Sequence, residues 1–344
     1  MTIELPILRL GLAGFSADQQ EALGAALAQA SAGELMWEIG KFDEADAWWI
    51  SGARTQLVGN ATIRVAPAVP TSRAVQLHLP DIDRPLAFAL PVVQPELEPT
   101  YCFDPASHES ISAVLAEFER LLQPLTAQFC LASHIVEHQS ALGRGVFDVS
   151  LSGRLLAVVD MHGEVGVLPG VDPTDFEDAE WRRRVPAFGI PEDFVTTSLS
   201  QLMWHYSLRT QRDLLPRHYR KGLLYFRRPP RLPQRVVRDS HLLLMRELAA
   251  APATFEALRL RTGMLAGQLA HDLAALYFVG SITSNAKRAA PISGERRGED
   301  TDGGLYSVNP SGLDSEIPAD AGRPPPRRPL TAHDLTAPAP LVPQ

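Results

Sequence analysis

The feature that most constrains the fold is a series of short apolar runs in residues 1–95, each of strand length and each bounded by Gly, Pro or Asp. The first run ends near Ala13, and a helix follows for which Ser16 is a suitable N-cap. Further strands are predicted at residues 35–40, 46–52, 73–79 and 84–91. A strand, a helix and then several continuously apolar strands predict a small α/β sheet.

This outline is similar to the receiver family and, more loosely, to flavodoxin-like domains, over residues 1–95. A receiver presents acidic residues after its first strand to hold a metal ion, whereas this chain reads GLAGFS there, and no Asp at the end of DAWWISG offers a phosphate acceptor. The resemblance therefore implies a degenerate domain without phosphotransfer. We interpret Asp43, Glu44 and Asp46 as a solvated turn before a buried strand, with a cation site as the alternative.

The middle of the chain, residues 107–206, is predicted to be a central α+β region. Residues 92–110 are rich in Pro and acidic residues and indicate a linker. Residues 111–141 carry apolar side chains at helical spacing, and Pro124 is expected to kink or divide that helix. Residues 145–170 predict a three-stranded meander, and a helix is expected to start near Pro191.

Composition sets the class of protein. A chain of 344 residues with 45% hydrophobic content buries a sizeable core in two or three domains. The two cysteines, Cys102 and Cys130, are expected to be reduced and buried. We find no signal peptide and no uncharged run of membrane-spanning length, so we expect a cytoplasmic protein without a membrane partner. Residues 291–344 hold ten of the 29 prolines and predict a disordered tail.

Charge is distributed unevenly along the chain. The net charge is −8, yet the stretch from Ser207 to Arg288 holds fifteen Lys and Arg against five Asp and Glu. Residues 1–206 hold twelve Lys and Arg against twenty-seven Asp and Glu. Such a basic segment favours a polyanionic partner. The alternative is internal neutralisation, in which the acidic half docks on the basic half and masks it until a signal or partner releases it.

The basic region, residues 207–290, ends in a predicted three-helix module. Asp239 or Ser240 caps a first helix to about residue 250, and Thr254 caps a short second helix. Gly263 marks a turn before a third helix at residues 265–277. A short strand and a basic tip follow at residues 281–289.

This module resembles the winged helix-turn-helix superfamily over residues 239–288. The resemblance implies a third helix in the major groove of DNA and a wing on the backbone. The leucine spacing predicts a buried stripe with five residues facing outward. The stripe comprises Leu265, Leu269, Leu273 and Leu276, and the outward residues are Gly267, Gln268, His271, Asp272 and Ala275. Only Gln268 and His271 are suited to base contacts, so we expect low sequence specificity.

Cations placed around the module are expected to hold phosphates. They are Arg259 and Arg261 on the second helix, Lys287 and Arg288 in the wing, and Arg217, Arg220, Lys221, Arg227, Arg228, Arg231 and Arg235 in an extended surface segment. The aromatic residues Tyr219, Tyr225 and Phe226 lie among them as possible platforms for bases. The alternatives are a solvated loop and a small anionic ligand.

Two short motifs suggest other ligands. Arg231 and Arg235 resemble the R-x-x-x-R element with which PilZ domains bind cyclic di-GMP, but the companion strand of that family does not follow. The sequence HIVEH, from His134 to His138, matches the H-x-x-E-H pattern of inverted zincins. No third ligand is evident, so we interpret these residues as exposed helical histidines and predict neither a metal nor a cofactor.

The sequence therefore predicts α/β plus α+β architecture and a non-enzymatic regulatory protein. No nucleophile paired with a base is evident, which argues against an enzyme. The predicted activity is binding to nucleic acid, mainly DNA, through phosphate contacts of the C-terminal winged helix. The alternative is a signalling adaptor that uses the winged helix to bind proteins and senses a small anionic ligand. The target, the input signal and the oligomeric state stay open.

Overall fold

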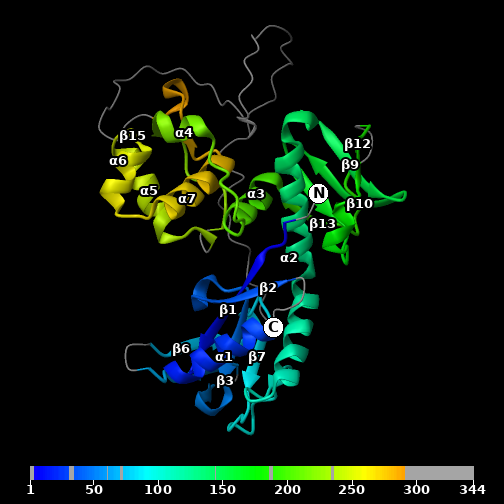
Figure 1. The fold of residues 1–344 in the computed structure, drawn as a ribbon, viewed down its shortest axis with the longest axis vertical. Helices are drawn as coiled ribbons and strands as arrows, with labels where there is room; N and C mark the ends of the chain where they lie inside the picture. The colour runs from blue at the N-terminus through cyan, green and yellow to red at the C-terminus, as the bar shows by residue number, and fades with distance from the viewer. Residues whose placement is uncertain are drawn as a thin grey trace, which may run out of the picture. The chain divides into compact units, whose positions relative to one another are not determined.

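A computed structural model of the chain describes residues 4–30, 35–59, 61–69, 73–143, 145–185, 189–233 and 236–290. The fold mixes α and β elements, with a parallel sheet at the N-terminus and three further sheets in the described residues (Figure 1). The predicted disordered tail, residues 291–344, lies outside the described residues.

The N-terminal sheet has five parallel strands in the order β2-β1-β3-β7-β8. They are β1 (Ile7–Ala13), β2 (Met36–Gly40), β3 (Ala47–Ser51), β7 (Leu86–Ala89) and β8 (Cys102–Phe103). Flavodoxin-like sheets share this strand order. The α/β sheet predicted from the apolar runs is thus confirmed, while the likeness to receivers stays a prediction.

The two faces of this sheet are covered differently. Trp49 on β3 faces a core shared with α1 (Ala17–Ala30) and the first half of α2 (His108–Leu142). Its neighbour Ile50 faces a second core shared with an antiparallel sheet, which the sequence analysis missed in part. That sheet comprises β4 (Thr55–Val58), β5 (Thr62–Val65) and β6 (Val75–His78). It connects β3 to β7 where a doubly wound fold has a helix.

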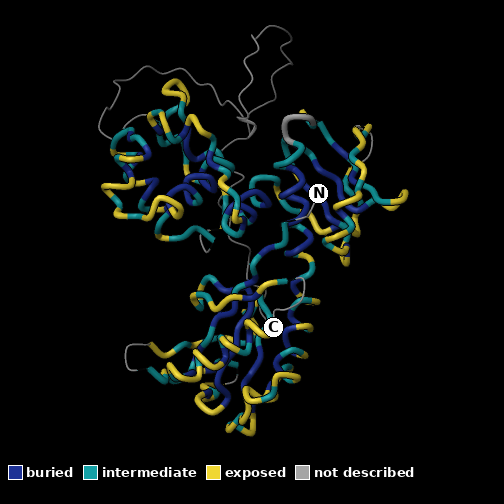
Figure 2. Tube along the Cα trace, viewed as in Figure 1, coloured by how far each residue is buried: buried dark blue, intermediate teal, exposed yellow. Residues whose placement is uncertain are grey.

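One helix, α2, serves two hydrophobic cores. Ser107 caps it, since its Oγ accepts from the Ser110 N–H at 3.3 Å, and Pro124 lies within it without dividing it. Of the two outcomes expected at this proline, the division is wrong, and the kink stays a prediction. Side chains from Ile111 to Leu122 pack on the N-terminal sheet, whereas those from Ala127 to Ile135 pack on a second sheet. The ribbon of α2 runs along both sheets (Figure 1), and its buried stretches are dark blue in Figure 2.

The second sheet is antiparallel, in the order β12-β9-β10-β11-β13. Its strands are β9 (Val146–Leu151), β10 (Arg154–Asp160), β11 (Glu164–Val167), β12 (Glu180–Arg183) and β13 (Val195–Ser198). The predicted meander is confirmed. The helix expected from Pro191 is wrong in its first half, because the β-branched residues of β13 pair with β11. Helix α3 (Leu199–Ser207) begins only after Ser198, whose Oγ accepts from Gln201 N–H.

The C-terminal helices form around a small sheet of order β15-β14-β16. The elements are α4 (Arg217–Lys221), β14 (Leu223–Phe226), α5 (Asp239–Ala250), β15 (Ala253–Thr254), α6 (Phe255–Thr262), α7 (Ala266–Phe278) and β16 (Ile282–Thr283). Thr254 Oγ1 accepts from Ala257 N–H at 3.2 Å, and Gly263 has a left-handed φ of 68°, as the capping signals predict. The prediction that residues 217–235 are extended is wrong at α4, where Tyr219 is buried.

Two global expectations can be compared with the structure. No helix of the described residues combines the length and apolar content needed to cross a membrane. Cys130 is buried, and burial followed by nearby carboxylates raises the pKa of its thiol to about 12. Cys102 is exposed on β8 at the sheet edge, so the prediction that both thiols are buried is wrong for this residue.

Candidate anion-binding surface

Helix α7 is too deeply buried to serve as a reading helix along its length. It packs against α3 and against α5, so two of its sides are covered. Asp272 and Ala275, predicted to face outward, are buried, and Leu265, predicted to be buried, is 77% exposed. Gln268 is exposed and His271 is half-buried. Only the first turn of α7 is therefore open to a partner.

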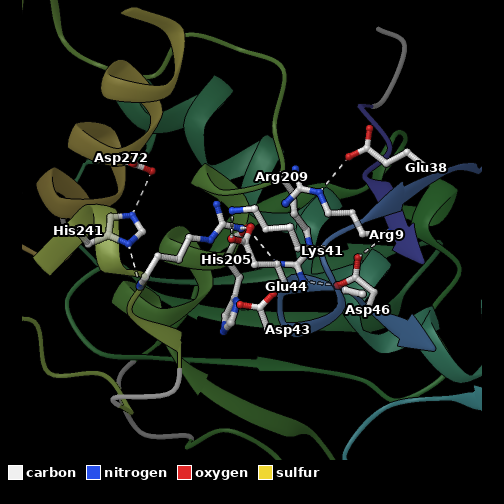
Figure 3. Close-up of polar contacts among 12 residues, drawn as sticks. Arg9, Glu38, Lys41, Asp43, Glu44, Asp46, His205, Arg209, His241 and Asp272 are labelled. Atoms are coloured by element: carbon white, nitrogen blue, oxygen red, sulfur yellow. Dashed lines mark hydrogen bonds and ion pairs between the residues drawn. The ribbon is translucent and has the colours of Figure 1, made fainter. Parts of the chain in front are cut away.

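A buried polar pair explains one of these errors. Asp272 on α7 and His241 on α5 are both buried, with Asp272 Oδ1 3.3 Å from His241 Nε2 (Figure 3). His241 Nδ1 accepts from the Arg238 N–H at 3.2 Å, which leaves the ring proton on Nε2, facing the carboxylate. The leucine spacing of the helix placed Asp272 on the outer side, because it takes no account of a buried partner on another helix.

Three arginines of the basic region pair with carboxylates of the acidic half. Arg209 binds Asp46 (Figure 3), and Arg238 Nη2 lies 3.1 Å from Glu44 Oε2. Arg212 contacts two carboxylates, with Nε 3.1 Å from Glu4 Oε2 and Nη1 2.6 Å from Glu137 Oε1. These pairs connect residues before position 140 with residues after position 205. Part of the positive charge is thus neutralised within the molecule.

The turn that holds Asp43, Glu44 and Asp46 is therefore not a solvated loop. Asp46 is buried, with 6% of its surface exposed, and its Oδ2 accepts from the Arg9 N–H at 2.9 Å. Beside it lies His205 (Figure 3), whose pKa falls to about 4 because burial disfavours the imidazolium and the Arg209 charge repels it. The prediction of solvated carboxylates is wrong for Asp46.

A second group of cations has no such partners among the residues that the structure describes. We name Arg227, Arg228, Arg231, Lys287 and Arg288 the β14 basic cluster, because they lie around the C-terminal end of β14. The backbone N–H groups of Arg227 and Arg228 donate to Ser281 O at 2.9 and 3.5 Å. The N–H of Ala290 donates to Phe226 O at 2.8 Å, which returns the short 3₁₀ turn η6 (Ala286–Arg288) to this strand end.

Charge repulsion within the β14 basic cluster is unrelieved. No Asp or Glu of the described ranges forms an ion pair with any of its five members. Burial lowers the pKa of Arg228, and the charges of Arg227 and Arg231 lower it further. The Arg228 Nε is buried and has no hydrogen-bond partner in the described part of the chain. An anion bound beside these side chains would relieve the repulsion.

Gly280 leaves room beside the guanidinium groups. Its φ is +66°, which disfavours any other residue, and a Cβ added there would lie 3.3 Å from Arg228 Nη2 and 3.5 Å from Arg227 Nη1. The glycine therefore closes α7 and also keeps space for the two side chains.

The remaining predicted cations are dispersed. Arg220 pairs with Asp213 and lies over the Phe255 ring at 5.0 Å, and Arg259 Nε lies 2.8 Å from Glu256 Oε2. Arg217, Lys221 and Arg261 are exposed. Arg235 lies outside the described residues.

The predicted aromatic platforms fare differently from one another. Tyr219 is buried and packs edge-on against Tyr277 with ring centroids 5.0 Å apart, so it cannot stack on a base. Tyr225 and Phe226 are half-buried, and Phe226 packs on the C-terminal core. Stacking on a base is thus limited to Tyr225 and Phe226, whose rings are partly covered.

Comparisons with known proteins found no match for this chain among protein-family models, curated proteins or solved structures. The geometry above is therefore the basis for a functional interpretation.

Proposed function

We propose that this chain is a non-enzymatic regulatory protein that binds nucleic acid through phosphate contacts of the β14 basic cluster, with little sequence specificity. The observation that carries the proposal is Arg228, a partly buried guanidinium that lies beside two further arginines and has no carboxylate partner among the described residues. Arginine presents several donors in a fixed fork that matches phosphate oxygens. A phosphate backbone supplies such oxygens at regular intervals.

Low specificity follows from the burial of α7. A helix that reads bases presents several side chains along one exposed side. Here only the first turn is exposed, and Gln268 is its one side chain suited to a bidentate base contact. We expect random and defined duplexes of equal length to compete equally for the protein.

The two fold resemblances are part of this proposal. The order α5, α6, α7 with a left-handed Gly263 turn and a three-stranded sheet supports a winged-helix relative. Its central strand, β14, precedes the helices in the chain and does not come from a hairpin after β16. The strand order of the N-terminal sheet supports a flavodoxin-like or receiver-like relative. A cytoplasmic location fits a partner of this kind.

The test is binding of the full chain to a random duplex at two salt concentrations. Five phosphate contacts give a slope of about −4.5 in log K against log salt. The variant Arg227→Gln, Arg228→Gln, Lys287→Gln, Arg288→Gln should lose most of this slope. Its matched control, Arg64→Gln, Arg73→Gln, Arg154→Gln, Arg182→Gln, makes the same change in net charge at exposed positions and should retain it. Equal losses in both variants would reject a defined surface.

A second candidate, the signalling adaptor, is favoured by two exposed leucines. Leu260 on α6 is 76% exposed and Leu265 before α7 is 77% exposed, on either side of the Gly263 turn. Exposed apolar side chains grouped in this way are typical of contact sites for other proteins. Under this function, Leu260→Ser with Leu265→Ser abolishes partner binding and the glutamine variant of the β14 basic cluster preserves it. Nucleic-acid binding gives the opposite pattern.

A further inference from the structure

A group of possible metal ligands lies on the second half of α2, and none of them belongs to the β14 basic cluster. His134, Glu137 and His138 occupy positions i, i+3 and i+4 of the helix, which places them on one side. One ligand atom from each lies within 4.8 Å of the others. The two imidazole rings are stacked, with centroids 5.8 Å apart and planes 10° apart.

The hydrogen bonds leave the imidazole nitrogens free for a ligand. His138 Nδ1 lies 3.0 Å from the His134 carbonyl oxygen, which only accepts, so Nδ1 carries the proton and the Nε2 lone pair is free. This is the bond that metal-bound histidines commonly make with their second nitrogen. The Trp181 ring packs on the same imidazole, at 6.2 Å between centroids, and holds its orientation.

His134 is the second observation that points to a ligand. Its surface is 8% exposed, contrary to the prediction of exposed histidines. Its ring nitrogens form no hydrogen bond with another described residue.

Arg212 forms an ion pair with Glu137, the carboxylate of this group. Its Nη1 lies 2.6 Å from Glu137 Oε1, while its Nε lies 3.1 Å from Glu4 Oε2. A metal ion and a guanidinium compete for one carboxylate, because both are cations. Glu4 offers Arg212 a second partner, so the arginine can release Glu137 without becoming unpaired.

We propose that His134, Glu137 and His138 bind a divalent transition-metal ion, with Zn²⁺ the best match, and that the ion displaces Arg212 from Glu137. Two imidazoles and a carboxylate form a common zinc donor set, and a fourth position is left for water. The ion thereby weakens one of the contacts that connect α2 with the segment after α3. Metal binding and the Arg212 ion pairs are coupled.

The experiment is calorimetric titration of the full chain with Zn²⁺ alone at neutral pH, after treatment with a chelator. One ion should bind per chain. His138→Ala and Glu137→Gln should each weaken binding about tenfold or more. Arg212→Gln should strengthen it, because the competing cation is gone. This gain separates a site coupled to Arg212 from histidines that bind zinc incidentally.

Two controls keep the result decisive. His108→Ala removes an exposed histidine from the same helix, and Cys102→Ser removes the exposed thiol; neither should change the affinity. Circular dichroism verifies that each variant folds, and a rise in Tm on adding Zn²⁺ should be lost only in the His138 and Glu137 variants. Absence of stoichiometric binding, or binding that survives His138→Ala and disappears with Cys102→Ser, overturns the proposal.

Discussion

Arg209 and Arg228 belong to the same basic region of the sequence, yet their surroundings differ. Arg209 is largely buried against Asp46, and the pair lies beside His205. Arg228 is partly buried among Arg227 and Arg231, without a carboxylate partner in the described residues. The first group of arginines, which includes Arg212 and Arg238, connects the acidic and basic halves of the chain. We propose that the second group, the β14 basic cluster, keeps its charge for an external anion.

The comparison shows that excess charge in a sequence has two separate meanings. A buried arginine with a buried carboxylate contributes to folding, because removing either partner leaves the other charge uncompensated. An arginine among other cations contributes nothing comparable to folding and costs free energy until an anion arrives. The internal-neutralisation hypothesis and the nucleic-acid hypothesis are therefore compatible, since each applies to different residues.

The largest expected effect is on stability at the paired arginine. Arg209→Ala should lower the free energy of unfolding by about 3 kcal/mol, because Asp46 is left buried with only the Arg9 N–H as a partner. Urea unfolding followed by circular dichroism measures the change.

Arg228→Gln is the matched comparison. It keeps most of the side-chain length and removes a repelled charge, so the free energy of unfolding should change by no more than about 0.5 kcal/mol. Equal destabilisation by the two substitutions would mean that the distinction between the two groups is wrong.

Local sequence signals predicted much of the fold. Ser16, Thr254 and Gly263 each act within four residues, and each occupies the helix end that was predicted. Elements that depend on distant partners were missed. Strand β13 forms because Val195 to Ser198 pair with β11, and β4 and β5 form because they cover the far side of the N-terminal sheet. Neither partner is visible from the strand's own residues.

The candidate site was predictable in composition and not in arrangement. The sequence showed that Arg227, Arg228 and Lys287 belong to an unusually basic region. It did not show that backbone hydrogen bonds to Ser281 O and Phe226 O bring these residues together at the end of β14. It also showed the leucines of α7 but not that α3 covers a second side of that helix, which buries Asp272. The exposure of a helix residue depends on every element that packs against the helix, whereas hydrophobic periodicity indicates only one packed side.

The second largest expected effect is on the pH dependence of stability, and it arises at His205 beside the Arg209–Asp46 pair. The pKa of His205 is about 4 in the folded chain and near its ordinary value of 6.5 when unfolded. The unfolded chain therefore takes up the proton first as the pH falls. Stability is fully present above pH 6.5 and declines down to pH 4, by up to about 3 kcal/mol at 1.36 kcal/mol per pKa unit.

His205→Gln isolates this contribution from the carboxylates that titrate in the same range. The free energy of unfolding, measured in urea from pH 7.5 to pH 4.5, should fall less steeply in the variant than in the natural chain. Parallel curves would assign the acid sensitivity to other groups and remove His205 from the account of the paired region.

The smallest expected effect tests how far the acidic half masks the basic half. Glu44→Gln frees Arg238, which is 28% exposed, and also removes the partner of the exposed Lys41, while the β14 basic cluster is unchanged. Two more available cations raise the salt dependence of duplex binding by at most about two units of slope. Glu38→Gln is the matched control, because it removes the same charge at the exposed pair with Arg9. A much larger gain from Glu44→Gln alone would show that this acidic turn, and not the unpaired cluster, limits access to the anion, and the division into two independent groups of arginines would fail.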